Sequence, residues 1–593
     1  MKKIFLLIAL TALYISTFAQ FGGGSGTEED PYRIYTKEHF EEFATENNSM
    51  NYEMYGDFSG IHLRLMNNIT DTVKIMPSSN PNSDFNGSFH GGGYSINIFP
   101  NSTIFQTVFN SIGTNGYIDS LKIVGTPYHF SSLVYTNYGT ISHCICDVTI
   151  IHPIAQADYR SGIANTNYGI IEHCVNLTNF TNAILPEINY WDCTVFSGIC
   201  YMNVGIIKYC KNKGNVSSKE ALSAGIAIYN IDNGIIEMCI NSGDNQALSV
   251  DPINVMTGGI ACTTEGNAII RNCVNTGNIV FSSIFPAGGI VYGASGNVNI
   301  INCLNLGNIS GYCVDNNNER GAGIIGSSND NTANIAYCLN LNKAGASAIV
   351  DTLLNFVSIN ATNNYYDKQT CLSKGINNED ISGSAEGKLT TQLTGTSPEL
   401  QAMLGDGWSY AEGRYPIPLG LENDSMALVA ATPVYLHFEN EEDYNHVDSV
   451  SKNFTVGLEN NVSWEEAFGR VSFNDENVQL LSIGYEILSV KLGNYSKKIN
   501  IIIVDTEVSS PEILSNNEIS IYPNPASEYL NIELNQHLSD EVQIYDISGK
   551  LLISKAINSN QTQINIADLE QGMYILNVLK SDRKIASLRF VKE

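Results

Sequence analysis

A cysteine that recurs every 29 to 36 residues through the middle of this 593-residue chain is its most constraining feature. Seven cysteines form the series: Cys144, Cys174, Cys210, Cys239, Cys273, Cys303 and Cys338. An isoleucine stands three residues before each one: Ile141, Ile171, Ile207, Ile236, Ile270, Ile300 and Ile335. An asparagine follows six of them two residues later: Asn176, Asn212, Asn241, Asn275, Asn305 and Asn340. A repeat of this length, built from short apolar stretches, predicts a solenoid of stacked β coils.

A second motif, a small residue followed by Gly-Ile, opens most of the units. It occurs at Ser161–Ile163, Ser197–Ile199, Ala224–Ile226, Gly258–Ile260, Gly288–Ile290 and Ala322–Ile324. Glycine at these positions allows tight turns and a close approach of neighbouring backbones.

Equivalent residues of successive coils should stack about 4.8 Å apart. The repeated cysteine is small and apolar, so we predict a buried column of reduced thiols. The asparagine stands where the chain must turn, and its side-chain amide can bond to the next rung. Three residues is an odd spacing for two inward side chains on one strand, which predicts a corner or bulge between the isoleucine and the cysteine.

These units resemble the GLUG-type repeats of bacterial surface proteins, which combine a Gly-Gly-apolar opening with Asn-Cys-x-Asn-x-Gly. The resemblance covers residues 131–343 and implies a right-handed parallel β-helix within an all-β protein. We expect an N-terminal cap and first coils over 20–114, in which a short helix with Phe40 and Phe43 caps the solenoid and Phe85–Gly93 forms the first coil. Repeats are expected over 115–370 and the end of the solenoid over 371–423.

Strand-like alternation continues after the solenoid. Residues 424–508 predict a small β-sandwich linker domain, and residues 515–593 predict a second small β-sandwich with Pro and Gly turn residues between its strands. The last segment also resembles the C-terminal sorting domain of the type IX secretion system of Bacteroidetes. The matching residues are Tyr522, Pro523, Asn524, Pro525, Asp546, Gly549, Gly572, Tyr574 and Lys592.

The N-terminus agrees with export. Two lysines precede the apolar run Ile4–Leu13, and a small-residue cleavage site follows at Thr17–Ala19, so residues 1–19 are predicted to be a signal peptide. No other stretch approaches eighteen apolar residues, and no transmembrane segment is expected. The resemblance implies handling by the type IX secretion machinery, passage through the periplasm, and a final location in the medium or on the outer-membrane surface.

The charge balance restricts the partners. Acidic residues outnumber basic ones 60 to 31, for a formal net charge of −29. A surface this acidic argues against nucleic acid or an anionic membrane as a partner.

Several groups of residues are candidate functional sites. Glu172, Lys208, Glu237 and Arg271 stand two residues before consecutive cysteines, and they form either a catalytic column or a solvated ladder of alternating charge, which we favour. His143 and His173 occupy equivalent positions in adjacent units. They could bind a metal ion together or, as we prefer, stack on one another as a structural pair. The loops 315–318 and 329–331 lack the carboxylate spacing of a Ca²⁺ site. Cys193, Cys200, Cys262 and Cys313 fall off the ladder, and a disulfide among them is left open.

No catalytic, metal-binding or cofactor-binding residue is therefore predicted. We favour a non-enzymatic, adhesin-like protein whose β-helix binds an extracellular glycan or a cell-surface protein. The alternative is a β-helix polysaccharide lyase or glycoside hydrolase that acts on extracellular glycans, since parallel β-helices also occur in such enzymes.

Overall fold

The computed structural model describes the chain in segments. They are residues 21–47, 57–73, 84–98, 106–127, 130–150, 158–181, 194–219, 221–248, 255–313, 320–328, 333–351, 359–368, 370–371, 373–431, 433, 446–448, 454–455, 463–474, 477–482, 484–492, 495–504, 519–534, 541–546, 550–557, 559, 561–580 and 583–592. The predicted signal peptide and the loops 315–318 and 329–331 lie outside them. The chain divides into two compact units, residues 1–432 and 433–593.

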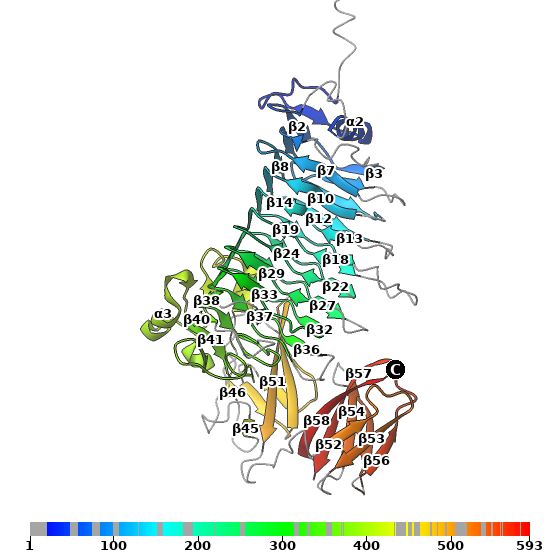
Figure 1. The fold of residues 1–593 in the computed structure, drawn as a ribbon, viewed down its shortest axis with the longest axis vertical. Helices are drawn as coiled ribbons and strands as arrows, with labels where there is room; N and C mark the ends of the chain where they lie inside the picture. The colour runs from blue at the N-terminus through cyan, green and yellow to red at the C-terminus, as the bar shows by residue number, and fades with distance from the viewer. Residues whose placement is uncertain are drawn as a thin grey trace, which may run out of the picture. The chain divides into compact units, whose positions relative to one another are not determined.

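Three long sheets of parallel strands run through the first unit (Figure 1). Sheet A contains β1 (Tyr32–Ile34), β2 (His62–Leu65), β5 (Ser88–His90), β8 (Tyr117–Asp119), β11 (Thr140–Ser142), β15 (Ile170–Glu172), β20 (Ile206–Lys208), β25 (Ile235–Glu237), β30 (Ile269–Arg271), β34 (Asn299–Ile301), β38 (Asn334–Ala336) and β40 (Asn360–Thr362). Sheet B contains β3 (Ile69–Val73), β6 (Ser95–Ile98), β9 (Lys122–Gly125), β12 (Ile145–Val148), β16 (Val175–Asn176), β21 (Lys211–Asn212), β26 (Ile240–Asn241), β31 (Val274–Asn275), β35 (Leu304–Asn305), β39 (Leu339–Asn340), β41 (Asn364–Asp367) and β42 (Ala385–Lys388). Sheet C contains β4 (Asp84–Phe85), β7 (Gln106–Ile112), β10 (Phe130–Asn137), β14 (Ala164–Asn167), β19 (Cys200–Asn203), β24 (Ala227–Asn230), β29 (Ala261–Gly266), β33 (Val291–Gly296) and β37 (Ile325–Ser328).

From β4 to β39 the coils visit these sheets in the order C, A, B, and the coils that begin with β10 to β33 add an arm with strands in one or both of two shorter sheets. Sheet E contains β17 (Phe180–Thr181), β22 (Val216–Lys219), β27 (Asn245–Leu248), β32 (Ile279–Ser283) and β36 (Ile309–Cys313). Sheet D contains β13 (Asp158–Ser161), β18 (Thr194–Ser197), β23 (Ser223–Ala224) and β28 (Thr257–Gly258). The Gly-Ile motif then leads from sheet D into the next strand of sheet C. The first unit is therefore a parallel β-helix, as the repeat predicted.

The corner between sheets A and B explains the spacing of isoleucine and cysteine. The residue directly before each repeated cysteine has a positive φ of 51° to 55°. These corner residues are His143, His173, Tyr209, Met238, Asn272, Asn302 and Tyr337, with Ser120 and Asn363 in the same conformation on the flanking coils. A left-handed residue costs roughly 1–2 kcal/mol. The backbone N–H of each corner bonds to the next rung, as from His143 to the Glu172 carbonyl at 3.0 Å, so the bend leaves no orphaned donor.

Apolar side chains fill the inside of the coils, and a helix covers the N-terminal end. The repeated isoleucines and cysteines are completely buried in one continuous core. The predicted capping helix is α2 (Lys37–Asn47), whose Phe40 and Phe43 pack against Phe89 and other phenylalanine rings. The parallel sheet begins earlier than the coil expected at Phe85–Gly93, because β1 precedes the helix and pairs in register with β2.

The end of the first unit contains short elements after the last coil. They are η1 (Thr390–Gln392), α3 (Pro398–Leu404), η2 (Gly405–Gly407), β43 (Trp408–Ser409), β44 (Ile417–Pro418) and α4 (Ser425–Ala430).

Within the described residues of the second unit there are four small sheets whose strands are mainly antiparallel, so the chain is all-β as predicted. The first two contain β45 (His446–Asp448), β51 (Tyr495–Val504), β50 (Gly484–Leu492) and β47 (Ser463–Glu466), and β46 (Phe454–Thr455), β49 (Asn477–Leu480) and β48 (Val471–Asn474). The last two contain β52 (Ile519–Tyr522), β53 (Tyr529–Leu534) and β56 (Gln561–Asn565), and β55 (Leu551–Ala556), β54 (Glu541–Asp546), β57 (Gly572–Lys580) and β58 (Arg583–Lys592).

Candidate functional site: the polar column of sheet A

The six repeated asparagines form a continuous hydrogen-bonded ladder inside sheet B. Each is fully buried, and from Asn176 to Asn305 the side-chain Nδ2 donates to Oδ1 of the next asparagine at 2.8 Å. The same Nδ2 donates to a backbone carbonyl two residues further on, as from Asn241 to Gly243 at 3.0 Å. These bonds close the backbone groups that the turn after sheet B would leave without partners.

The glycine of the second motif borders this ladder. A Cβ on Gly225 would lie 2.2 Å from Cγ of Asn241, and one on Gly198 would lie 2.4 Å from Cγ of Asn212. The two repeated motifs therefore meet in space, and glycine is required there because the asparagine amide occupies the volume of a side chain.

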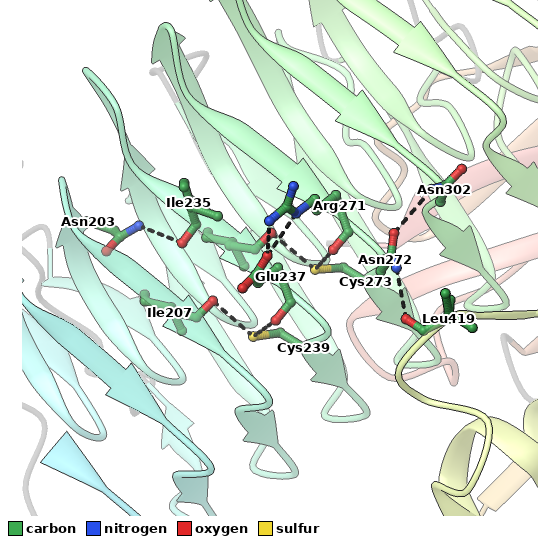
Figure 2. Close-up of polar contacts among 11 residues, drawn as sticks. Asn203, Ile207, Ile235, Glu237, Cys239, Arg271, Asn272, Cys273, Asn302 and Leu419 are labelled. Carbon is green, nitrogen blue, oxygen red and sulfur yellow. Dashed lines mark hydrogen bonds and ion pairs between the residues drawn. The ribbon is translucent and has the colours of Figure 1, made fainter. Parts of the chain in front are cut away.

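The seven repeated cysteines form a column of free, fully buried thiols. Each one donates weakly to backbone carbonyls, as from Cys239 to Glu237 at 3.3 Å and to Ile207 at 3.7 Å (Figure 2). Burial raises the pKa of the Cys174, Cys239, Cys273 and Cys338 thiols well above the ordinary value. All seven thiols are closed off from solvent, so this column is built for packing rather than for chemistry.

The off-ladder cysteines lie on different columns. Cys200 and Cys262 are buried free thiols of sheet C. Cys200 pairs in register with Ala164 and Ala227, whereas Cys262 belongs to a separate apolar cluster formed by residues of sheets C and D. Cys193 lies outside the described residues, and Cys313 is the last residue of β36.

A polar column runs along sheet A. Its register passes through His90, Asp119, Ser142, Glu172, Lys208, Glu237 and Arg271. Every member contacts a neighbour on an adjacent rung. His90 Nδ1 lies 2.6 Å from Asp119, and Lys208 Nζ lies 3.0 Å from Glu172, which also accepts from the Ser142 hydroxyl at 3.2 Å.

The last pair of this column is bidentate. Nε and Nη2 of Arg271 donate to Oε2 of Glu237 at 2.7 and 2.5 Å (Figure 2). Because the carboxylates alternate with cations instead of converging, the column holds neither two facing acids nor a free base. The structure thus brings together the four charged residues of the sequence analysis, Glu172, Lys208, Glu237 and Arg271. They form the ladder of alternating charge that we favoured there.

Partial burial and charge oppose each other at the carboxylates of this column. Burial raises the pKa of Glu172, but the hydrogen bond and charge of Lys208 together with the Ser142 hydroxyl more than offset it, so the pKa lies below the ordinary 4.5. At Asp119 burial likewise acts upward, and the hydrogen bond and charge of His90 hold the pKa below its ordinary value. Both groups are therefore stabilised as anions.

The two predicted histidines stack at the corner beside this column. The rings of His143 and His173 lie 4.7 Å apart at an interplanar angle of 11°, and Tyr209 continues the stack at 4.8 Å and 2°. Parallel rings on successive rungs favour the structural interpretation over metal binding. Within the described ranges, no group of three or more His, Cys, Asp or Glu side chains is placed to hold a metal ion.

The segment after the last coil packs against the same corner further along the helix. Nδ2 of Asn272 donates to the Leu419 carbonyl at 2.8 Å (Figure 2), and Nε1 of Trp408 donates to the Tyr337 carbonyl at 3.2 Å. Lys211 forms an ion pair with Asp424. The segment that follows the last coil, which contains Trp408, Leu419 and Asp424, therefore covers residues at the corner between sheets A and B that the solenoid alone would expose.

Sequence reasoning missed two features. A second asparagine ladder joins Asn137, Asn167, Asn203 and Asn230 of sheet C, with Nδ2-to-Oδ1 distances of 2.7 to 2.8 Å. The pattern Asn-x-Gly at the first three of these positions was the available signal. The other missed feature is a group of solvent-exposed tyrosines on sheet C and its arm, foreshadowed only by the 31 tyrosines against 3 tryptophans.

The last two sheets contain the residues singled out in the tail. Tyr522 is exposed at the end of β52, and Asn524 Oδ1 accepts from the Val591 N–H at 2.8 Å. Asp546 Oδ1 accepts from the Lys550 N–H at 2.9 Å and thereby closes the turn after β54. Tyr574 is buried and stacks on Phe590 at 5.5 Å.

The remaining tail positions are simply placed. Gly572 begins β57, Lys592 ends β58, Pro523 and Pro525 flank Asn524, and Gly549 lies outside the described residues.

Residues 520–593 match the family described as the secretion system C-terminal sorting domain. The tail is a type IX sorting domain. Its presence indicates export, with secretion or attachment to the cell surface, and it implies handling by the type IX secretion machinery. In the part of the chain that the structure describes, no helix is both long and apolar enough to cross a membrane.

Two curated relatives match short stretches of this sorting-domain protein. One is the ulvan lyase NLR42 of Nonlabens ulvanivorans, 29% identical over 85 residues, which are 14% of this chain and 15% of the relative. The other is a putative Gly-rich membrane protein of Evansella cellulosilytica, 30% identical over 166 residues, which are 24% of this chain and 18% of the relative. The chain thus spans less than a fifth of either relative.

Two solved structures are similar at low identity. A putative immunoglobulin A1 protease from Bacteroides ovatus has 15% identity and a TM-score of 0.27, over 68% of this chain and 95% of that one. Dimeric latent PorU from Porphyromonas gingivalis has 16% identity and a TM-score of 0.12, over 25% and 17% of the two chains.

Proposed function

We propose that this exported protein is a non-enzymatic, adhesin-like binding protein. Its β-helix, built from GLUG-type repeats, presents a long surface to an extracellular glycan or to a protein of another cell. An N-terminal signal peptide directs the chain to the periplasm, and the sorting domain then takes it across the outer membrane.

The pairing of charges along sheet A is the observation that supports this proposal. From His90 to Arg271 each charged side chain of the polar column already has a partner on an adjacent rung. General acid–base catalysis needs a group poised to give or take a proton, and a salt-bridged ladder removes that freedom. A column whose charged side chains are all paired with one another is suited to a surface that binds a ligand without transforming it.

An enzyme remains the alternative because of one comparison. The matched stretch of the ulvan lyase relative raises the question whether this chain also degrades a polysaccharide. A lyase on this β-helix would use the polar column, with Lys208 as the base and Glu172 and Glu237 facing the substrate.

Incubation of the purified full chain with glycans separates the two functions. Uronate-containing and neutral polysaccharides are followed by ultraviolet absorbance and by reducing ends, and retention on the same polymers is measured in parallel. We expect retention without products. Products that disappear in the variant Glu172→Gln/Glu237→Gln would contradict the binding function and establish the enzyme.

A further inference from the structure

Four tyrosines gather where sheet D meets sheet C. Tyr135 belongs to β10, Tyr159 to β13, Tyr201 to β19 and Tyr229 to β24. The rings of Tyr159 and Tyr201 lie 4.3 Å apart at 32°, and those of Tyr201 and Tyr229 lie 5.5 Å apart, edge to face. We call these four residues the tyrosine cluster.

The tyrosine cluster exposes aromatic surface above an apolar floor. Tyr135 and Tyr159 are 48% and 47% exposed, while Tyr201 and Tyr229 are half-buried. Against Tyr201 and Tyr229 pack Val195 and Ala224 of sheet D with Ile228 and Cys262 of sheet C. This floor holds those two rings in place before any ligand arrives, and Tyr159 stacks on Tyr201.

The cluster extends along the axis of the β-helix. Its sheet C members lie on β10, β19 and β24, which span four successive rungs because β14 stands between β10 and β19, and Tyr159 lies on β13 of the arm. Three steps of about 4.8 Å give a length of about 14 Å, which suits a short linear oligomer better than a compact small molecule.

The hydroxyl groups of the cluster lie near one another and stay protonated. Burial, followed by the nearby hydroxyls of Tyr229, Tyr159 and Tyr135, raises the pKa of Tyr201. Burial also raises the pKa of Tyr229, with contributions from Cys262, Tyr159 and Glu265. A neutral phenol both donates and accepts a hydrogen bond, which matches the hydroxyl groups of a sugar.

The charges around the cluster disfavour an anionic ligand. The carboxylate of Glu265 acts on Tyr229. The whole chain has a net charge of −29. A uronate or sulfated polymer would therefore meet electrostatic repulsion.

We propose that the tyrosine cluster is the binding site for a neutral glycan chain that lies along the β-helix axis. Apolar C–H faces of the sugar rings contact the tyrosine rings, and sugar hydroxyls bond to the phenol oxygens. This inference rests on the binding function proposed above and names its ligand class and residues. The polar column of sheet A takes no part in it.

Isothermal titration calorimetry of the purified full chain tests the site. The probes are cellohexaose, laminarihexaose and mannohexaose as neutral oligomers, and oligogalacturonate and chondroitin sulfate oligomers as anionic ones. Tyr135→Ala/Tyr159→Ala removes the two most exposed rings of the cluster, Tyr159→Phe keeps the ring and the stack, and Tyr94→Ala, 38% exposed elsewhere, is the matched control.

We expect at least one neutral oligomer to bind, with a Kd about tenfold higher in the double alanine variant. The control should equal the wild type, and Tyr159→Phe should fall between the two. Circular dichroism verifies that each variant is folded, and Tyr135→Ala alone serves if the double variant is not.

Three results would overturn the inference. Neutral oligomers that bind the double variant as tightly as the wild type would place the site elsewhere and leave the binding function intact. Binding of anionic oligomers alone would refute the ligand class. If no oligomer of either kind binds, the glycan-binding function itself fails together with the site.

Discussion

Replacement of Asn241 by alanine tests the asparagine ladder directly. Asn241 is fully buried, donates to Asn275 Oδ1 at 2.8 Å and to the Gly243 carbonyl at 3.0 Å, and accepts from Asn212 Nδ2 at 2.8 Å. Alanine supplies none of these bonds. The variant strands two buried acceptors completely, whereas Asn212 keeps its second bond, to the Gly214 carbonyl at 2.9 Å.

The expected cost follows from these partners. A buried polar group without its hydrogen bond costs about 1–3 kcal/mol, so two stranded acceptors and one weakened donor predict a loss of about 3–6 kcal/mol. Units of a solenoid contact only their neighbours, so the damage should be concentrated on the rungs of Asn212 and Asn275.

Urea unfolding and amide hydrogen exchange measure this loss. Asn297→Ala is the matched control, because Asn297 is exposed and its amide lies 3.4 Å from Asn267 in an outer pair. We expect the control to stay within about 0.5 kcal/mol of the wild type. If Asn241→Ala also stayed within that range, and the neighbouring amides kept their protection, the ladder would not stabilise the coil and the reasoning would be refuted.

Four other predictions concern the remaining features. Gly225→Ala should lower the midpoint of thermal unfolding, because its Cβ would lie 2.2 Å from Cγ of Asn241; an unchanged midpoint would show that the ladder yields easily. Cys239→Ser should cost roughly 1–3 kcal/mol in urea unfolding, and native wild-type Cys239 should resist thiol labelling, whereas rapid labelling would argue against a closed column. The pKa of Glu172 is lowered on folding, so the Glu172 carboxylate contributes its full stabilisation above the ordinary pKa of 4.5 and loses it as the pH falls through the folded pKa. Glu172→Gln should therefore reduce the loss of folding free energy at acid pH. An unchanged dependence of the unfolding free energy on pH would contradict the ion pair. Deletion of residues 515–593 should leave the β-helix folded but retain the protein in the periplasm, as cell fractionation would show; normal export would refute the role of the tail.

The tail illustrates what similarity of local patterns can establish. Its sorting motifs occur in the order that the resemblance requires, and the family match to residues 520–593 confirmed the export predicted from them. The ligand of the β-helix had no comparable signal, because an exposed binding residue has no partner within the chain to impose a period on the sequence.

The sequence by itself determined the parallel β-helix, since stacking repeats the same environment at each rung and thus the same residue. Ile207, Cys210 and Asn212 recur because a core position, a corner and a turn recur. Even the bend between isoleucine and cysteine followed from their odd spacing, and the structure shows it as a left-handed residue.

Only the tertiary structure decided which unlike residues meet. Gly225 and Asn241 are sixteen positions apart and belong to different motifs, yet they touch across the coil. Tyr135 and Tyr201 share one register position of sheet C, but Tyr229 stands one position further along its strand and Tyr159 lies on sheet D, and only the fold brings the four together. Such contacts depend on where each arm turns back onto sheet C, and the length of the loops varies from coil to coil. A periodic pattern in the sequence specifies which equivalent residues stack on successive rungs, whereas only the folded chain specifies which residues of different motifs lie side by side.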